Sequence, residues 1–177
     1  MRSNRTTISL LAAALFVSAV SAGIAAAERD DDDDDEKEVS EKDLQGAKVS
    51  LEDGLKASEA QGTPISAKFE LDKGKLQLSV YTMKGAGFSE VVVDYKSGKV
   101  LKTDSITEGG DLKAAQEQSA AMGKAKESLR AAVGQAVAAN KGFRAVRAAP
   151  AMDNGHPVAT IVLVKGKDSH SVVQKLD

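Results

Sequence analysis

Alternating apolar and polar residues predict a run of strands in the first half of the chain. The alternation is strict from residue 65 to 72, which indicates a strand with one buried face. A second strand starts at Leu76, a third covers 88–95 and a fourth covers 99–103, with glycine-containing turns between them. This order predicts an antiparallel meander. In the first strand, the face expected to be buried carries Ile65, Ala67, Phe69 and Leu71, and the face expected to meet solvent carries Ser66, Lys68, Glu70 and Asp72.

One helix is predicted before this meander in the sequence and another after it. Ser50 is a good N-cap, and Asp53 three residues later completes a variant of the capping box. Gly62 and Pro64 then end this first helix. Residues 111–122 are rich in Ala and Gln and predict a second helical segment.

The plan of the first half then recurs. Ser128-Leu129 opens a segment that matches Ser50-Leu51, a shift in numbering of 78 (128 − 50). The turn at Asp153-Asn154-Gly155 corresponds to Asp72-Lys73-Gly74, a shift of 81 (153 − 72). We interpret the chain as two copies of a helix-plus-sheet unit. Coincidence among Ala- and Val-rich segments is the alternative.

The predicted fold class is therefore α+β, with tandem units of one helix packed on an antiparallel meander. The first unit covers 47–107, a helical linker covers 108–124, and the second unit covers 125–177. The second copy stops at Asp177, roughly where Asp94 stands in the first, so it is truncated and lacks the closing hairpin.

The N-terminal segment has the three parts of a secretory signal peptide. Arg2 and Arg5 precede an apolar run over 8–20, and small residues follow it. Cleavage is expected after Ala27, with Ala22 as the alternative. The apolar run is shorter than the roughly 20 residues of a membrane-spanning helix, which disfavours an uncleaved anchor. We therefore expect a periplasmic or secreted protein that does not contact the membrane once the leader is removed.

Charge is concentrated just after the leader. Residues 28–38 hold nine acidic and two basic side chains, whereas 39–177 hold 17 acidic and 20 basic ones. The segment 28–46 is predicted to be an acidic disordered tail. Its carboxylates attract divalent cations weakly, without the glycine and spacing of a preformed calcium loop, and a purely solvated tail is the alternative. The aspartates in question are Asp30, Asp31, Asp32, Asp33, Asp34 and Asp35.

Catalytic chemistry finds little support in the sequence. The chain has no cysteine and only two histidines, His156 and His170, and neither lies in a nucleophile motif. With Asp153 and Asp168 they form a conceivable two-histidine, two-aspartate surface metal site. No phosphate loop or dinucleotide fingerprint occurs, so no cofactor is expected, and few aromatic residues argue against nucleic-acid binding. The expectation is that the protein is not an enzyme.

Two segments resemble the signatures of PepSY domains. The helix opening at 50–57 resembles the capped start of their helix, and the segment 94–101 resembles their closing turn. Gly54 departs from the pattern, which usually has Ala, and the second copy lacks the glycine turn. The resemblance covers 47–104 well and 125–177 weakly. The residues that carry it, in structural roles, are Ser50, Asp94, Ser97, Gly98 and Val100.

The resemblance implies a small α+β fold and a role in inhibiting or regulating peptidases. Our hypothesis from the sequence is an exported non-catalytic binding module that acts on a peptidase, a sensor or another envelope protein. Exposed strand edges offer a way to recruit such a protein partner. The alternative is a weak divalent-cation-binding envelope protein that acts through its acidic tail.

Overall fold

Three helices and seven strands follow one another along residues 39–177, the part of the chain that the computed structural model describes. The strands form a single antiparallel sheet in the order β4-β3-β2-β1-β5-β6-β7. The predicted α+β fold class is confirmed. The elements are α1 (Leu51–Ser58), β1 (Thr63–Asp72), β2 (Lys75–Lys84), β3 (Gly87–Val93), β4 (Val100–Ile106), α2 (Gly109–Met122), α3 (Leu129–Ala139), β5 (Arg144–Asp153), β6 (His156–Lys165) and β7 (Asp168–Lys175).

Two-residue turns join β1 to β2, β2 to β3, β5 to β6 and β6 to β7, and the turn types repeat between the halves. Lys73-Gly74 and Asn154-Gly155 both have positive φ at each position, which is the conformation of a type I′ turn. Gly85 and Gly166 have φ of +62° and +61°, and the residue after each is not in the positive region, as in a type II′ turn. Both turn types match the right-handed twist of the strands that they connect.

Strand registers repeat between the halves as well. Asp72 pairs with Lys75 in the first half, and their counterparts Asp153 and His156 pair in the second. A β-bulge lies between Pro64 and Ser66, and another lies at the equivalent place, between Ala145 and Arg147. The backbone of the two halves is therefore equivalent from β1 to β3 and from β5 to β7, with a constant shift in numbering of 81.

This constant shift corrects one detail of the predicted repeat. It makes Asp177 the counterpart of Lys96 rather than of Asp94. Division of the chain into separate domains stays a prediction, because all seven strands belong to one sheet.

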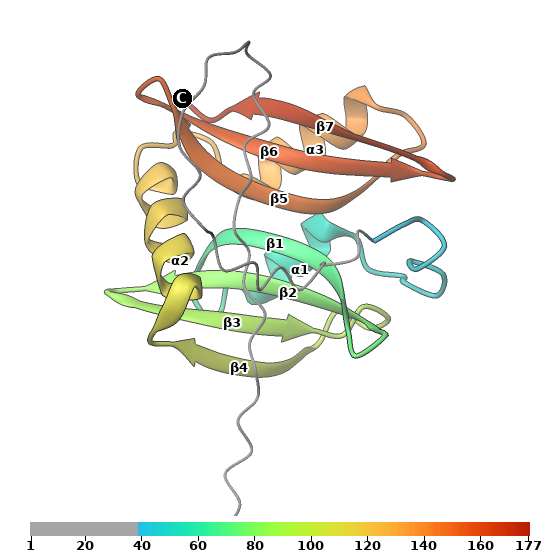
Figure 1. The fold of residues 1–177 in the computed structure, drawn as a ribbon, viewed down its shortest axis with the longest axis horizontal. Helices are drawn as coiled ribbons and strands as arrows, with labels where there is room; N and C mark the ends of the chain where they lie inside the picture. The colour runs from blue at the N-terminus through green and yellow to red at the C-terminus, as the bar shows by residue number, and fades with distance from the viewer. Residues whose placement is uncertain (1–38) are drawn as a thin grey trace, which may run out of the picture.

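The halves meet where β1 pairs with β5. Ala67 pairs with Ala148, the residue equivalent to Ala67 at the shift of 81, and Lys68 pairs with Arg147. A local twofold pseudo-axis therefore passes through the Ala67–Ala148 pair. Figure 1 shows the two halves side by side in one twisted sheet.

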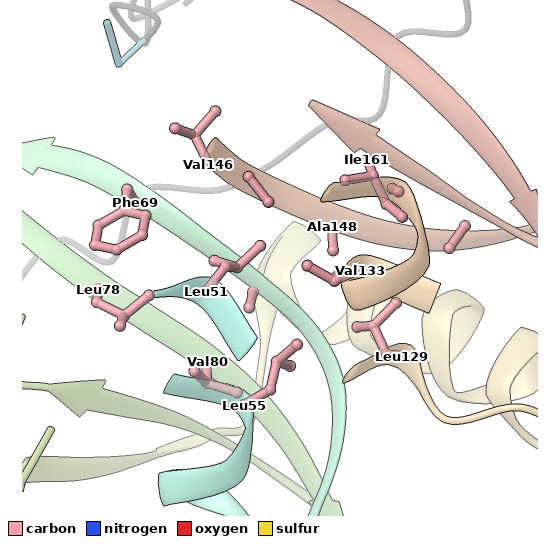
Figure 2. Close-up of a cluster of buried hydrophobic side chains, with 14 of the residues drawn as sticks. Leu51, Leu55, Phe69, Leu78, Val80, Leu129, Val133, Val146, Ala148 and Ile161 are labelled. Atoms are coloured by element: carbon pink, nitrogen blue, oxygen red, sulfur yellow. The ribbon is translucent and has the colours of Figure 1, made fainter. Parts of the chain in front are cut away.

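The main core lies between the sheet and the helices α1 and α3. Leu51 and Leu55 of α1 and Leu129 and Val133 of α3 point into the same space as the inner side chains of the strands (Figure 2). Both helices begin at a serine N-cap, and the apolar face of each is buried. Full burial of a large aliphatic side chain contributes about 1.5–3 kcal/mol, so this shared layer stabilises both halves together.

Equivalent positions in the two halves of the core exchange large and small residues. Gly54 of α1 packs on Leu78 of β2, and a Cβ on Gly54 would lie 2.6 Å from Leu78 Cδ2. The counterparts in the second half are Ala132 in α3 and Ala159 in β6, and both are buried. The first half therefore has glycine and leucine at these two positions, and the second half has alanine at both.

The helix α2 covers part of the opposite face of the sheet. It packs against β1, β5 and β6 (Figure 1), and Ala115 joins a second apolar cluster with Ile65, Tyr81 and Ile106. The predicted faces of the first strand are therefore partly wrong. The bulge after Pro64 inserts Ile65 as an extra residue, so Ile65 lies with the second cluster and not beside Ala67.

Polar residues predicted to meet solvent on β1 are also buried. Ser66 and Lys68 are 5% and 3% exposed, because α2 and the neighbouring strands cover this face. The prediction from alternation was wrong for these two residues.

Candidate functional site

A buried polar cluster lies on the face of the sheet that α2 partly covers. Its members are Lys68 and Glu70 on β1, Gln77 and Ser79 on β2, and Glu90 on β3. Each alternates along its strand with a residue of the main core, which places all five on the other face. Glu90 is only 7% exposed, so its carboxyl group requires partners inside the protein.

Ser79 connects the two carboxyl groups of this cluster. Its Oγ lies 2.6 Å from Glu70 Oε1 and 2.8 Å from Glu90 Oε1. A hydroxyl group has one proton, so it donates to one carboxylate and accepts from a group on its other side. Gln77 Nε2 lies 2.8 Å from the same Oγ and 3.3 Å from each carboxyl oxygen.

Burial of the cluster shifts the titration of Glu90. Burial raises the pKa of Glu90, and the charge of Glu70 adds to this effect, although the hydrogen bond with Ser79 opposes it. Glu70 Oε2 also pairs with Lys68 Nζ at 2.6 Å, which links two neighbouring positions of β1. The cluster is a hydrogen-bonded network that ties β1, β2 and β3 together.

A small hollow lies next to this cluster, at the pseudo-axis and beneath α2. Its volume is about 20 Å³. Ser66 Oγ donates to Gln118 Oε1 at 2.7 Å on its wall, and Lys68, Tyr81, Asp111 and Arg147 also line it. Each of those four residues has interactions of its own. The hollow holds about one water molecule, whereas small-molecule sites measure about 300–1,000 Å³.

The two histidines lie too far apart to share a metal ion. His156 begins β6, whereas His170 pairs with Leu163, seven residues further along β6 (163 − 156). At about 3.3 Å per residue, this separation is roughly 23 Å. The surface metal site considered from the sequence is therefore wrong, because these side chains do not come together. Its four residues were Asp153, His156, Asp168 and His170. Across residues 39–177, no group of three or more His, Cys, Asp or Glu side chains is placed to hold a metal ion.

Each histidine instead has a separate partner. His156 Nδ1 lies 2.5 Å from Asp177 Oδ2, and this contact lowers the pKa of Asp177. The ring of His170 meets that of Phe143 edge-on at 4.6 Å between centroids, and its Nε2 lies 3.3 Å from Asn140 Oδ1. These contacts fasten β6 and β7 to neighbouring segments.

The residues that carry the PepSY resemblance hold local structure. Ser50 Oγ accepts from the backbone N–H of Asp53, and Asp53 Oδ2 accepts from the backbone N–H of Ser50, each at 3.1 Å, so the predicted capping box is confirmed. The hydrogen bonds that Asp53 Oδ2 accepts from the backbone N–H and the hydroxyl group of Ser50 lower the pKa of Asp53.

The closing turn has the geometry expected from its sequence. Asp94 Oδ1 accepts from the backbone N–H of Ser97 at 2.6 Å, and Gly98 has φ of +74°. Val100 re-enters the sheet opposite Val93. The aspartates at 30–35 lie outside the described residues.

The outer edge of β7 is the feature that most clearly separates the two halves. In the described part of the chain, β7 ends the sheet and pairs only with β6. Its counterpart β3 pairs with β2 on one side and with β4 on the other. Val173 on this edge is 62% exposed, and within residues 39–177 Leu101 is the other large apolar side chain that is mostly exposed.

The buried polar cluster was not predicted from the sequence. Lys68 and Glu70 alternate with apolar residues, and such a pattern usually marks a solvated face. One signal was present in Tyr81 and Ile106, because apolar residues on that face require a cover. The Ala-rich helix α2 provides it, since small side chains allow a helix to lie close to a sheet.

Comparisons with known proteins identify no relative. No family model, no curated protein and no solved structure matches the chain. No helix within residues 39–177 has the length and apolar character needed to cross a membrane.

Proposed function

We propose that the chain is an exported, non-catalytic protein-binding module that regulates a peptidase or another envelope protein. One observation carries this proposal. The edge of β7 has no neighbouring strand in the described residues, whereas the equivalent edge of β3 is covered by β4. An unpaired edge offers a row of backbone donors and acceptors to an extended segment of another protein.

Three further features support a binding role. The leader at 1–27 predicts export, and the PepSY-like segments suggest peptidase regulation. The buried polar side chains satisfy one another, and none is left without a hydrogen-bond partner in the described residues. The hollow under α2 is also far smaller than a substrate site. These features favour recognition by a surface over chemistry in a pocket.

Peptidase inhibition tests the proposal directly. The protein purified after export is titrated against secreted metallopeptidases, and the hydrolysis of an internally quenched peptide substrate is followed. We expect at least one peptidase to be inhibited at a stoichiometry near one to one, and the inhibitor to remain uncleaved. Bovine serum albumin at the same concentration controls for substrate competition. Full activity of every peptidase, together with no binding by calorimetry, would contradict the peptidase role.

A further inference from the structure

We propose that the outer edge of β7 binds an acidic partner segment as an additional antiparallel strand, in the place that β4 occupies in the first half. This inference rests on the proposed function, and it specifies the binding surface, the register and the chemistry of the partner. The first half supplies the template, because its strands pair in the same register as their counterparts in the second half.

The template sets the register. In β3, the backbone N–H and C=O groups of every second residue point away from β2 and toward β4. These residues are Phe88, Glu90 and Val92. Their counterparts on β7, at the constant shift in numbering, are Ser169, Ser171 and Val173.

Hairpin geometry gives the same three residues. The two-residue turn closes on the pair Lys165 and Asp168, so alternate residues from Asp168 onward bond to β6. The backbone N–H of Leu176, in this same series, donates to Pro157 O at 2.9 Å. The intervening residues therefore direct their N–H and C=O groups outward.

The side chains beside this edge favour aliphatic residues within the added strand. Val91 is fully buried in the first half, whereas its counterpart Val172 is only half-buried. Val137 and Phe143 are also partly buried and pack against the core on the α3 side. Val173 is exposed on the other face. An added strand with aliphatic residues at alternating positions would cover Val172 on one face and Val173 on the other.

Charge selects an acidic partner. The second unit, 125–177, holds eight basic and four acidic side chains. Lys165 ends β6, Lys167 lies in the turn that follows it, and Lys175 ends β7. A second copy of this chain would bring two such positive units together, which their repulsion disfavours. The chain's own segment at 28–38 is acidic, but aspartate-rich sequence forms strands poorly.

A designed peptide tests the proposal. The probe carries the sequence of Val100–Ile106 with two aspartates added at each end, and a second probe carries lysines there. Amide hydrogen exchange of the exported protein is measured with and without each probe at low salt. We expect the acidic probe to protect the amides of Ser169, Ser171 and Val173 at least tenfold, and the lysine probe to bind at least tenfold more weakly.

Proline variants provide a matched pair. Ser171→Pro removes an outward N–H without removing a bond to β6, and edge strands tolerate proline at such positions. We expect it to weaken probe binding at least tenfold. Ser105→Pro places the same change on the outer edge of β4 and is expected to leave binding unchanged, because Ser105 lies between the residues that bond to β3. If Ser171→Pro loses the fold by circular dichroism, Val173→Glu tests the same edge through charge.

Several results would overturn the inference. Equal binding by Ser171→Pro, protection elsewhere than β7, or equal affinity of both probes would each do so. Protection of β7 without a probe that disappears on deleting 28–38 would assign the edge to the chain's own segment. Protection that rises with protein concentration would assign it to a second copy. Probe binding without inhibition of any peptidase would leave this inference standing and count against the proposed function.

Discussion

The contact between Gly54 and Leu78 offers a quantitative test of how the two halves pack. A Cβ at Gly54 would lie 2.6 Å from Leu78 Cδ2, 3.1 Å from Cγ and 3.3 Å from Cδ1. Leu78 is completely buried, so any shift of its side chain has to be taken up by the packed side chains around it. Gly54→Ala therefore forces α1 away from the sheet or Leu78 into a less favourable rotamer.

Two opposing effects set the magnitude. Alanine in place of glycine within a helix gains up to about 1 kcal/mol. Overpacking a filled core costs about 1–3 kcal/mol, and we take about 2 kcal/mol because three atoms of one leucine are too close. Gly54→Ala is then expected to destabilise the protein by about 1 kcal/mol, which lowers the Tm by roughly 2–4 °C.

The second half supplies the compensating change. Ala132 and Ala159 occupy the positions equivalent to Gly54 and Leu78. Leu78→Ala alone should cost about 2–5 kcal/mol through the cavity that it leaves. In that background, Gly54→Ala no longer meets a leucine, so it should stabilise the protein by up to about 1 kcal/mol.

Urea unfolding of the four proteins in this double-mutant cycle measures the coupling, expected to be about 2 kcal/mol. Gly134→Ala in α3 is the control, because no atom of residues 39–177 lies within 4 Å of the added Cβ, and it should be stabilising. If Gly54→Ala is equally stabilising with and without Leu78, the packing argument is refuted.

The polar contacts and the acidic segment yield three further predictions. Burial raises the pKa of Glu90, so the folded state holds its proton more tightly and stability falls as pH rises above the unfolded pKa of Glu. Glu90→Gln should therefore remove this fall in the Tm above the unfolded pKa of Glu, and an unchanged slope would contradict the effect of burial on Glu90. Ser50→Ala should cost about 0.5–2 kcal/mol, as should Ser128→Ala. The loss at Ser50 should shrink as the pH falls through the lowered pKa of Asp53, because protonation removes the charge of this partner, while the loss at Ser128 should stay constant. Calorimetry with calcium should give weak heat that deletion of 28–38 abolishes, and heat retained after the deletion would place the cation elsewhere.

The alternating pattern predicted the β1 and β2 strands, because side chains in a strand alternate with period two and β2 has one core-facing side. The same rule failed at Ile65, because a bulge adds one residue without any composition that marks it. The turns at Gly74 and Gly155 were readable from the sequence, because few residues adopt positive φ at low cost.

Long-range contacts were beyond the reach of local patterns. The pairing of Ala67 with Ala148 joins opposite halves of the chain, and neither strand differs in composition from an edge strand. The buried Lys68 depends on this pairing and on the position of α2. The burial of Lys68 therefore could not be predicted from the sequence of its own strand.

The pseudo-axis at Ala67 and Ala148 gives the chain the geometry of a homodimer whose subunits have been fused. The two halves present the same seam to each other, as the subunits of an isologous dimer do. Fusion turns their association into an intramolecular event at a local concentration in the millimolar range. It also means that the first half of one molecule fits the second half of another, so concentrated refolding should yield exchanged dimers in which every strand keeps its native neighbours.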